Sequence, residues 1–407
     1  MKKTVLFSYQ QLSNVGCEII IRGTVAFLTR TFPQHDLEFV VSSYNPERDR
    51  ALLADVPSVT VVPMQGWKRY LRGLLQKTGL FDSHWVPRFA TSEFRRADLF
   101  CSVGGDIYTM FGNSIPHDWL GYENFASRHG IPSIMFGANM ERFEVVPEAD
   151  RKKLIDHLKR FKVLAVRDAG TVEYLGSHGV SDNVTLHPDP CFCLRPVTTF
   201  ERRPIRRIAI NFTPILIRDF GAPVVERFAR IVEALVGKGY EISFVPHVYS
   251  SEDLPSLSDP DALARLYAAL SPEVQAQVKR FEGPISFATV AAALREIDLF
   301  VGGRMHGCLN SLTLGKAVCF VGYSRKVRTM VDWLASESPF SVMSRSYGAV
   351  PADEIDVGWL EQLIAAHDIW AAADPGGKVV IDTQAYLDGL TARARVAEAV
   401  DLNASKR

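Results

Sequence analysis

Short apolar runs recur along the chain and alternate with segments of helical spacing. In the first half the runs fall at residues 4–9, 37–43, 59–64, 98–105, 132–140 and 162–168. Most are nearly continuous in Val, Ile, Leu and Phe, which is typical of strands buried on both faces. Between them, residues 18–32 have the apolar spacing of a helix packed on one side. The first half is therefore predicted to hold a parallel sheet covered by helices on both faces.

The same pattern restarts after residue 195. An arginine- and proline-rich connection, 195–208, leads into a second series of strands and helices. The strands are predicted at 207–212, 241–247 and 316–323, the helix at 224–240, and a helix leading into a strand at 290–303. The last part of the chain has helical spacing at 359–370 and 386–400. A second sheet of the same kind is therefore predicted, followed by helices.

An internal repeat supports two similar halves. The stretches RRADLFCSVGGD (95–106) and REIDLFVGGR (295–304) share Arg, two residues and Asp-Leu-Phe, and both then reach Val-Gly-Gly, directly in the second and after two more residues in the first. We expect an α/β protein of two doubly wound, Rossmann-like domains, 1–195 and 196–345, that face each other across a cleft. Helices in 346–407 could pack back on the N-terminal domain. Ligands of such sheets bind at the carboxyl ends of the strands, which places both Gly-Gly pairs at the cleft.

The stretch after the second Gly-Gly pair has the strongest chemical character. Gly302, Gly303 and Gly307 would let the backbone turn and a ligand approach. The residues that follow read as the start of a helix, whose amides attract an anion. Arg304 adds a fork suited to carboxylate or phosphate, and His306 can exchange a proton near neutral pH. The combination predicts a site for a small anion that needs acid–base chemistry.

Other candidates follow strands in the same way. Lys326 lies in a run of cations after the strand 316–323 and could complete an anion pocket, or belong to a solvated surface. His247 ends a predicted strand on the same side. In the first half these candidates are Asn14, Gly104, Gly105, Asp106 and Arg167. Asn14 could cap a helix, and Asp106 could act as a base, orient a sugar hydroxyl or cap a helix.

Composition narrows the class of protein. Hydrophobic residues make up 47% and charged residues 23%, as in soluble globular proteins. Lys+Arg and Asp+Glu both number 46, so the chain has no net positive charge that would attract it to nucleic acid. The six cysteines are scattered, which favours free thiols over a metal site. With no signal peptide or membrane-spanning run in the sequence, we expect a cytoplasmic protein without a metal.

One basic and aromatic stretch leaves a membrane contact open. Residues 67–77 mix Trp, Tyr, Leu, Lys and Arg. This mixture could lie on an anionic membrane surface as a peripheral contact, or form an ordinary surface helix.

The chain resembles the polysaccharide pyruvyltransferase family over roughly residues 4 to 335. The pieces that carry the resemblance are NVGCEIIIRG (14–23), VGGDIYT (103–109), VRDAGTVEYL (166–175), HPDPCFCL (187–194) and GGRMHGCLNSLTLGKAVCFVGYSRKV (302–327). The last, with Arg-x-His-Gly and a later Tyr and Lys, is the most specific. The chain departs from the family at Cys17, where Asp is usual, and at Val103, where a third glycine is common.

The resemblance implies a reaction. Such enzymes transfer pyruvate from phosphoenolpyruvate to two hydroxyls of a sugar, form a cyclic ketal and release phosphate. They have two domains arranged as in GT-B glycosyltransferases and need no metal or other cofactor. Arg304 and His306 match the family's functional Arg and His, and Lys326 matches its later basic position. The acceptor would be a saccharide, which could be lipid-linked.

The resemblance and the residues together suggest roles. His306 would protonate the methylene carbon of phosphoenolpyruvate as a general acid. Arg304, Lys326 and Arg167 would hold the carboxylate and the phosphate. Asp106 would deprotonate the acceptor hydroxyl. The N-terminal domain would bind the acceptor and the C-terminal domain the donor.

Two other functions stay open. A GT-B glycosyltransferase with a nucleotide-sugar donor would share the architecture, but would need an acidic residue for the ribose near the end of a second-domain strand. A non-catalytic sugar- or anion-binding protein could keep the same fold. Release of phosphate from phosphoenolpyruvate, against release of nucleotide from a nucleotide sugar, separates the two enzymes.

Overall fold

The chain forms two compact units in a computed structural model. The structure describes residues 1–8, 12–43, 45–63, 96–110, 112–115, 117–194, 199–249, 258–322, 330–334, 344–380 and 383–403. Unit 1 contains Met1–Leu12, Ile20–Leu194 and Leu387–Arg407, and unit 2 contains Ser13–Ile19 and Arg195–Tyr386. The stretch 67–77 lies outside the described residues. Within the described ones, no helix has the length and apolar character that crossing a membrane requires.

Unit 1 is built on a seven-stranded sheet in which all neighbouring strands are parallel. In spatial order the strands are β3 (Val59–Pro63), β2 (Asp36–Ser43), β1 (Lys2–Phe7), β4 (Leu99–Val103), β6 (Ser133–Ala138), β8 (Val163–Val166) and β9 (Val184–Leu186). The order reverses between β1 and β4, as in doubly wound sheets. The predicted parallel sheet of the first half is confirmed, and Gly104 and Gly105 follow β4 at the reversal.

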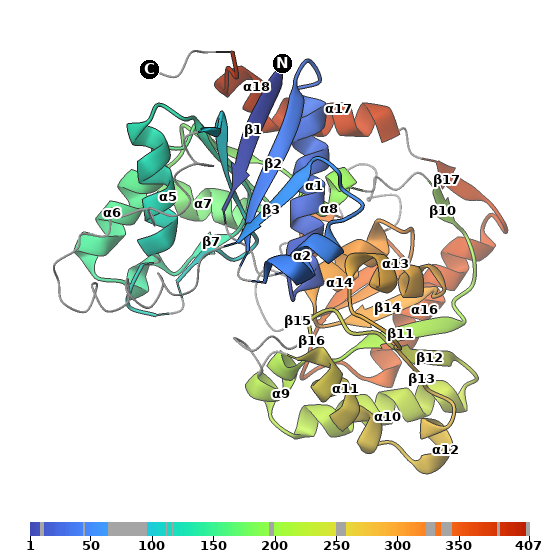
Figure 1. The fold of residues 1–407 in the computed structure, drawn as a ribbon. Helices are drawn as coiled ribbons and strands as arrows, with labels where there is room; N and C mark the ends of the chain where they lie inside the picture. The colour runs from blue at the N-terminus through green and yellow to red at the C-terminus, as the bar shows by residue number, and fades with distance from the viewer. Residues whose placement is uncertain are drawn as a thin grey trace. The chain divides into compact units, whose positions relative to one another are not determined.

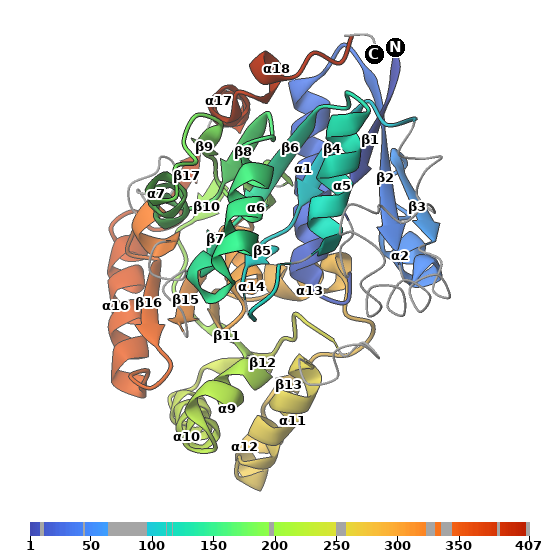
Figure 2. The same ribbon diagram turned by 90° about the vertical axis from the view of Figure 1, so that its left-hand side faces the viewer.

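Helices cover both faces of this sheet (Figures 1 and 2). Met135 of β6 packs in one apolar cluster with residues of α5 (His117–Arg128) and α6 (Glu148–Leu158). The next residue, Phe136, stacks on Phe27 of α1 (Val15–Thr31), with ring centroids 4.2 Å apart. Because neighbouring residues of a strand point to opposite faces, α1 and the α5–α6 pair lie on opposite sides.

The smaller elements of unit 1 complete its two layers. They are α2 (Pro46–Leu52), the 3-10 turn Phe143–Val145, α7 (Ala169–Ser177), α8 (Cys191–Leu194), α18 (Val396–Ala399), and β5 (Tyr108–Thr109) paired with β7 (Met140–Glu141). Helix α17 (Thr383–Ala394) begins in unit 2 and continues in unit 1.

Unit 2 is built on a six-stranded parallel sheet. In spatial order its strands are β13 (Lys279–Arg280), β12 (Glu241–Phe244), β11 (Arg207–Asn211), β14 (Leu299–Gly302), β15 (Ala317–Gly322) and β16 (Tyr347–Pro351). This order is that of a doubly wound sheet, and it reverses between β11 and β14. Asn211 and Gly302 are paired where these two strands end. The two repeated stretches therefore occupy the same place in their sheets, at the strand beside the reversal.

Helices also cover both faces of the second sheet. Apolar residues of α10 (Pro223–Gly237), α11 (Asp259–Ala268) and α16 (Val357–Ala372) pack in one cluster with the strands. Figure 1 shows α13 (Phe287–Arg295) and α14 (Met305–Leu312) on the other face. The remaining elements are α9 (Pro214–Phe220), α12 (Pro272–Gln275), and β10 (Thr199–Glu201) paired antiparallel with β17 (Lys378–Val380).

One part of the C-terminal prediction is wrong. Residues from 346 onward were expected to be helical, but β16 is an edge strand of the second sheet. Its Tyr347 and Val350 are buried. A five-residue strand that contains Gly348 and ends at Pro351 has too little apolar alternation to be recognised, and proline is tolerated at a sheet edge. The helices at 359–370 and 386–400 are present as parts of α16, α17 and α18.

Helix α1 packs closely on the turn that precedes α8. A Cβ on Gly23 would lie 2.6 Å from the carbonyl carbon of Pro190, so a larger residue does not fit there. The ring of His187 lies beside Phe27 and Phe136, with centroids 5.2 and 4.7 Å away. His187 is completely buried, and this burial lowers its pKa to about 4. The packing of α1 therefore depends on a glycine and on a neutral imidazole.

Replacing Gly23 by Ala should lower the free energy of unfolding by about 1–3 kcal/mol, because the methyl group overpacks the contact with Pro190. Urea unfolding of the purified protein measures this change. Gly176 of α7 is the matched control, since beyond its own helix turn no atom lies within 4 Å of a Cβ placed there. Gly176→Ala should be neutral or stabilising, as Ala favours helix over Gly. Equal losses in the two variants would contradict the proposed packing.

The buried His187 should make stability depend on pH. Its pKa is 6.5 when unfolded and about 4 when folded, so its stabilising effect is complete above pH 6.5 and is lost as the pH falls toward 4. Between pH 7.5 and pH 5.0 the loss due to this residue should be about 2 kcal/mol. In His187→Gln, urea unfolding should show a pH dependence smaller by that amount. An unchanged pH dependence in the variant would contradict the assignment.

Candidate functional site

The Gly-Gly turn after β14 is present, but its glycines make room for the protein's own side chains. A Cβ on Gly302 or Gly307 would lie 3.0 or 2.9 Å from the Cζ atom of Phe300. A Cβ on Gly303 would lie 3.3 Å from Leu216. All three glycines are buried. The packing against Phe300 and Leu216 is thus one reason for glycine at these positions, and their predicted contact with a ligand stays a prediction.

Arg304 is held at the start of α14 by two buried polar residues. Its side chain is only 10% exposed, and its Nε and Nη2 atoms donate to Oδ1 of Asp259 at 3.0 and 2.8 Å. Its backbone N–H donates to Oδ1 of Asn211 at 3.1 Å. Asp259 and Asn211 are completely buried. Because a guanidinium stays charged at any physiological pH, the site contains a permanent cation in a fixed place.

His306 lies in the first turn of α14 and is half-buried. Its ring contacts Gly16 in the first turn of α1, where a Cβ would lie 2.7 Å from Nδ1. This part of α1 belongs to unit 2, so the contact lies within that unit. The first amides of α14 have no acceptor inside their own helix and carry its positive dipole end. His306 therefore lies where an anion would meet that helix end.

His247 is a second imidazole in the same place. It is 1% exposed, and in the described part of the chain neither ring nitrogen has a hydrogen-bond partner. Burial lowers its pKa well below the ordinary value, and the charges of His306 and Arg304 lower it further. Buried polar groups are nearly always hydrogen-bonded, so this unsatisfied imidazole is a candidate for contact with a ligand. Strand β12 ends at Phe244, before His247, and the ligand role of His247 stays a prediction.

The segment Ser13–Ile19 completes this site from a distant part of the sequence. The backbone N–H of Val15 donates to the carbonyl of His247 at 3.1 Å. The N–H of Tyr249 donates to the carbonyl of Ser13 at 3.2 Å. These bonds fasten the start of α1 beside His247.

Two side chains of the same segment each accept a backbone N–H at the start of a helix, Asn14 at α1 and Glu18 at α13. Oδ1 of Asn14 accepts the N–H of Gly16 at 2.8 Å, so Asn14 caps α1 as predicted. Oε2 of the buried Glu18 accepts the N–H of Phe287, the first residue of α13, at 2.9 Å. A carboxylate at the start of a helix is favourable in charge as well as in hydrogen bonding.

A second group of predicted residues lies at the strand ends of unit 1. Arg167 is 1% exposed; its Nη1 donates to Oδ2 of Asp189 at 2.7 Å, and its Nη2 lies 3.6 Å from Oδ1 of Asp106. Its Nε donates to Asn139, which in turn donates to Asp168. Its buried guanidinium bonds within unit 1 and holds Asp106, whose side chain is 50% exposed. The predicted role of Arg167 in holding substrate stays a prediction.

The presence of glycine at positions 104 and 105 also has structural reasons. Gly104 has a φ of 154°, a conformation that favours glycine. A Cβ on Gly105 would lie 2.9 Å from Nη2 of Arg167. These glycines therefore shape the loop that presents Asp106.

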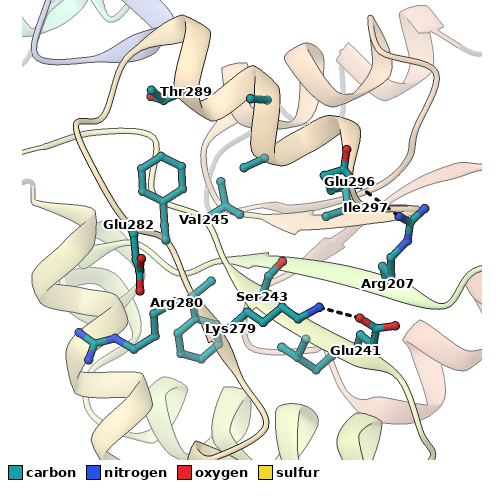
Figure 3. Close-up of a pocket in the computed structure, with 15 residues that line it drawn as sticks. Arg207, Glu241, Ser243, Val245, Lys279, Arg280, Glu282, Thr289, Glu296 and Ile297 are labelled. Atoms are coloured by element: carbon teal, nitrogen blue, oxygen red, sulfur yellow. Dashed lines mark hydrogen bonds and ion pairs between the residues drawn. The ribbon is translucent and has the colours of Figure 1, made fainter.

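A separate cavity of about 400 Å³ lies along β12 and β13 beside α13 (Figure 3). Arg207, Glu241 and Lys279, the first residues of their strands, line one end of it. Nζ of Lys279 lies 2.8 Å from Glu241, and Nη1 of Arg207 lies 3.8 Å from Glu296. Because these charges are paired with each other, the cavity is a poorer place for a small anion than the carboxyl end of the sheet.

Asp259 is the main residue that the sequence did not reveal. It lies in the stretch 253–262, whose prolines and acidic residues are typical of a loop, and it is the first residue of α11. Ser258-Asp259-Pro260 has the composition of a helix start, which was the available signal. Lys326 lies outside the described residues, so its role stays a prediction.

Two of the solved structures similar to this chain are UDP-GlcNAc 2-epimerases. The UDP-GlcNAc 2-epimerase from Methanocaldococcus jannaschii has a TM-score of 0.54 and 10% identity, with 96% of this chain and 100% of that chain covered. The UDP-GlcNAc 2-epimerase from Neisseria meningitidis, bound to UDP-GlcNAc, has a TM-score of 0.51 and 11% identity, with coverage of 91% and 94%. These enzymes have the GT-B fold, and the predicted fold class is confirmed.

Sequence comparison identifies a family whose activity differs from that of these epimerases. No curated protein sequence matches the chain significantly. Residues 14–325, however, match the sequence model of one family. That range includes Asn14, Asp106, Asp259, Arg304 and His306. The chain belongs to the polysaccharide pyruvyl transferase family.

Proposed function

We propose that the protein transfers pyruvate from phosphoenolpyruvate to two hydroxyls of one sugar in a polysaccharide or its lipid-linked precursor. The methylene carbon of the donor gains a proton, and C2 becomes an oxocarbenium-like centre. The first hydroxyl adds to C2 and gives up its proton. The C2–O bond to phosphate then breaks, and the second hydroxyl adds to C2 and loses its proton. The products are a cyclic ketal and inorganic phosphate.

Donor binding is assigned to the start of α14. Phosphoenolpyruvate carries a carboxylate and a phosphate, which need fixed cations and amide donors. Arg304 supplies a permanent charge beside the first-turn amides of α14. His247 is neutral because burial and its cationic neighbours lower its pKa, so it can take part in a hydrogen bond without adding charge.

Proton transfer to the donor is assigned to His306. An imidazole is suited to give a proton to the methylene carbon and to take one from a hydroxyl in the same turnover. Its place in the first turn of α14, against Gly16, leaves the ring half-buried beside the proposed anion site. Asp106, which is held by Arg167 and half exposed, is proposed as the base for the acceptor. Lys326 is proposed as a further donor ligand.

One observation carries this proposal. In a member of this family, Arg304 and His306 lie on one helix turn where the second doubly wound sheet reverses, the usual ligand position of such sheets. A cation and an acid–base group at that point match the needs of phosphoenolpyruvate.

The protein should bind phosphoenolpyruvate and release phosphate from it when a saccharide acceptor is present. Calorimetry measures donor binding, and a coupled phosphate assay with a mixture of bacterial polysaccharide fragments measures turnover. His306→Gln should lower kcat by about 10²–10⁴-fold and change the donor Kd by less than about threefold, because the residue acts in proton transfer. Arg304→Lys should weaken donor binding about tenfold or more, since Lys lacks the planar fork.

His129→Gln is the control, because His129 is exposed on unit 1. It should leave both measurements unchanged. Full turnover in His306→Gln would overturn the acid assignment. Release of nucleotide from a nucleotide sugar, without phosphate release from phosphoenolpyruvate, would instead identify a glycosyltransferase.

A further inference from the structure

We propose that Asp259 is a positioning residue for Arg304 in donor binding. The inference rests on the proposed function, since it assigns a cause to the orientation of the proposed donor-binding arginine. Asp259 is completely buried and lies 45 positions before Arg304 in the sequence. It reaches the site because α11 begins beside the carboxyl ends of β11 and β12.

The two carboxylate oxygens of Asp259 accept hydrogen bonds from different groups. Oδ1 accepts two hydrogen bonds from the guanidinium, from Nε at 3.0 Å and from Nη2 at 2.8 Å. Oδ2 accepts the backbone N–H groups of His247 at 2.9 Å and Val248 at 3.0 Å, and the side-chain amide of Asn211 at 3.2 Å. One oxygen therefore fixes the carboxylate to the protein, and the other fixes Arg304 to the carboxylate.

This arrangement determines which part of Arg304 can meet a ligand. Two donors on one oxygen hold the Nε side of the planar guanidinium against Asp259. The Nε edge of the guanidinium is therefore occupied by Asp259 and is not the edge that an anion would meet. Without Asp259 the side chain could rotate among several orientations, and part of the binding free energy would be spent on ordering it.

The carboxylate also connects the other groups of the site. Through the N–H of His247 it holds the segment whose carbonyl accepts the N–H of Val15. Through Asn211 it is linked to the N–H of Arg304, because Oδ1 of Asn211 accepts that bond at 3.1 Å. Asp259 thus lies between the starts of α1 and α14, which present Gly16 and His306.

A matched carboxylate occurs at the other end of the same sheet. Oδ2 of Asp298 accepts the backbone N–H groups of Arg206 at 3.1 Å and Arg207 at 2.9 Å. Its Oδ1 accepts Nη2 of Arg207 at 2.8 Å. Asp298 therefore has the same chemistry as Asp259, two consecutive amides and one arginine, but it lies just before β14. It serves as a control for the structural effect of removing such a carboxylate.

The test compares Asp259→Asn with Asp298→Asn in the full-length protein. An asparagine can keep its carbonyl oxygen toward the two amides, but it turns an NH₂ donor toward the guanidinium and loses the Oδ1 contact. Asp259→Asn should raise the donor Kd for phosphoenolpyruvate about tenfold or more and lower kcat by less than about threefold. Asp298→Asn should change neither by more than about twofold. Asp259→Glu, which keeps the charge, should recover part of the affinity.

A spectroscopic measurement separates this inference from the proposed function. In protein labelled with ¹⁵N-arginine, the Nε–H resonance of Arg304, assigned by its absence in Arg304→Lys, should be protected from exchange in the wild type and in Asp298→Asn. In Asp259→Asn it should exchange with solvent or vanish. If the wild type bound no phosphoenolpyruvate but this difference held, the proposed function would fail while the positioning of Arg304 stood.

The inference is overturned if Asp259→Asn keeps both the protected resonance and wild-type affinity. A double-variant comparison adds a second criterion: with Arg304 already changed to Lys, Asp259→Asn should weaken binding much less than it does alone. Full additivity of the two changes would show that Asp259 does not act through Arg304. If Asp259→Asn does not fold, Asp259→Glu is measured alone, and unchanged affinity together with an unchanged Nε–H resonance would refute the assignment.

Discussion

The guanidinium of Arg304 is nine-tenths buried, so it needs a partner of opposite charge inside the protein. Asp259, at the start of α11, provides that charge. Removing one partner of such a pair typically destabilises a protein by about 3–5 kcal/mol, because the other charge is left without compensation. The same carboxylate accepts backbone amides from the segment after β12. The ion pair therefore ties the starts of α11 and α14 together at one point, and through His247 it extends to the start of α1.

The topology explains why this point carries the chemistry. Both sheets reverse their strand order beside the strand of the repeated Asp-Leu-Phe stretch. In unit 1 the glycines after that strand lead to Asp106, which Arg167 holds from within the sheet. In unit 2 they lead to Arg304 and His306. The equivalent place in the two sheets thus carries different side chains, an exposed carboxylate in unit 1 and a cation with an imidazole in unit 2.

Periodicity was sufficient to predict the two parallel sheets, most of their strands and the helix start after Gly303. It could not predict contacts between distant parts of the chain. Asp259 looked like a loop residue, because nothing in its neighbourhood shows that a buried arginine will need it. The glycines at 302 and 307 suggested space for a ligand, whereas the space is taken by the ring of Phe300. The packing of Gly16 against His306 joins two distant parts of the sequence, and only the structure shows it.

The central claim is that the first turn of α14 binds the donor. A crystal structure of the protein with phosphoenolpyruvate tests it most directly. The account predicts the carboxylate or phosphate within hydrogen-bond distance of Arg304 and of the first amides of α14, with the methylene carbon about 3–3.5 Å from an imidazole nitrogen of His306. Phosphoenolpyruvate bound away from Arg304 and His306 would contradict it.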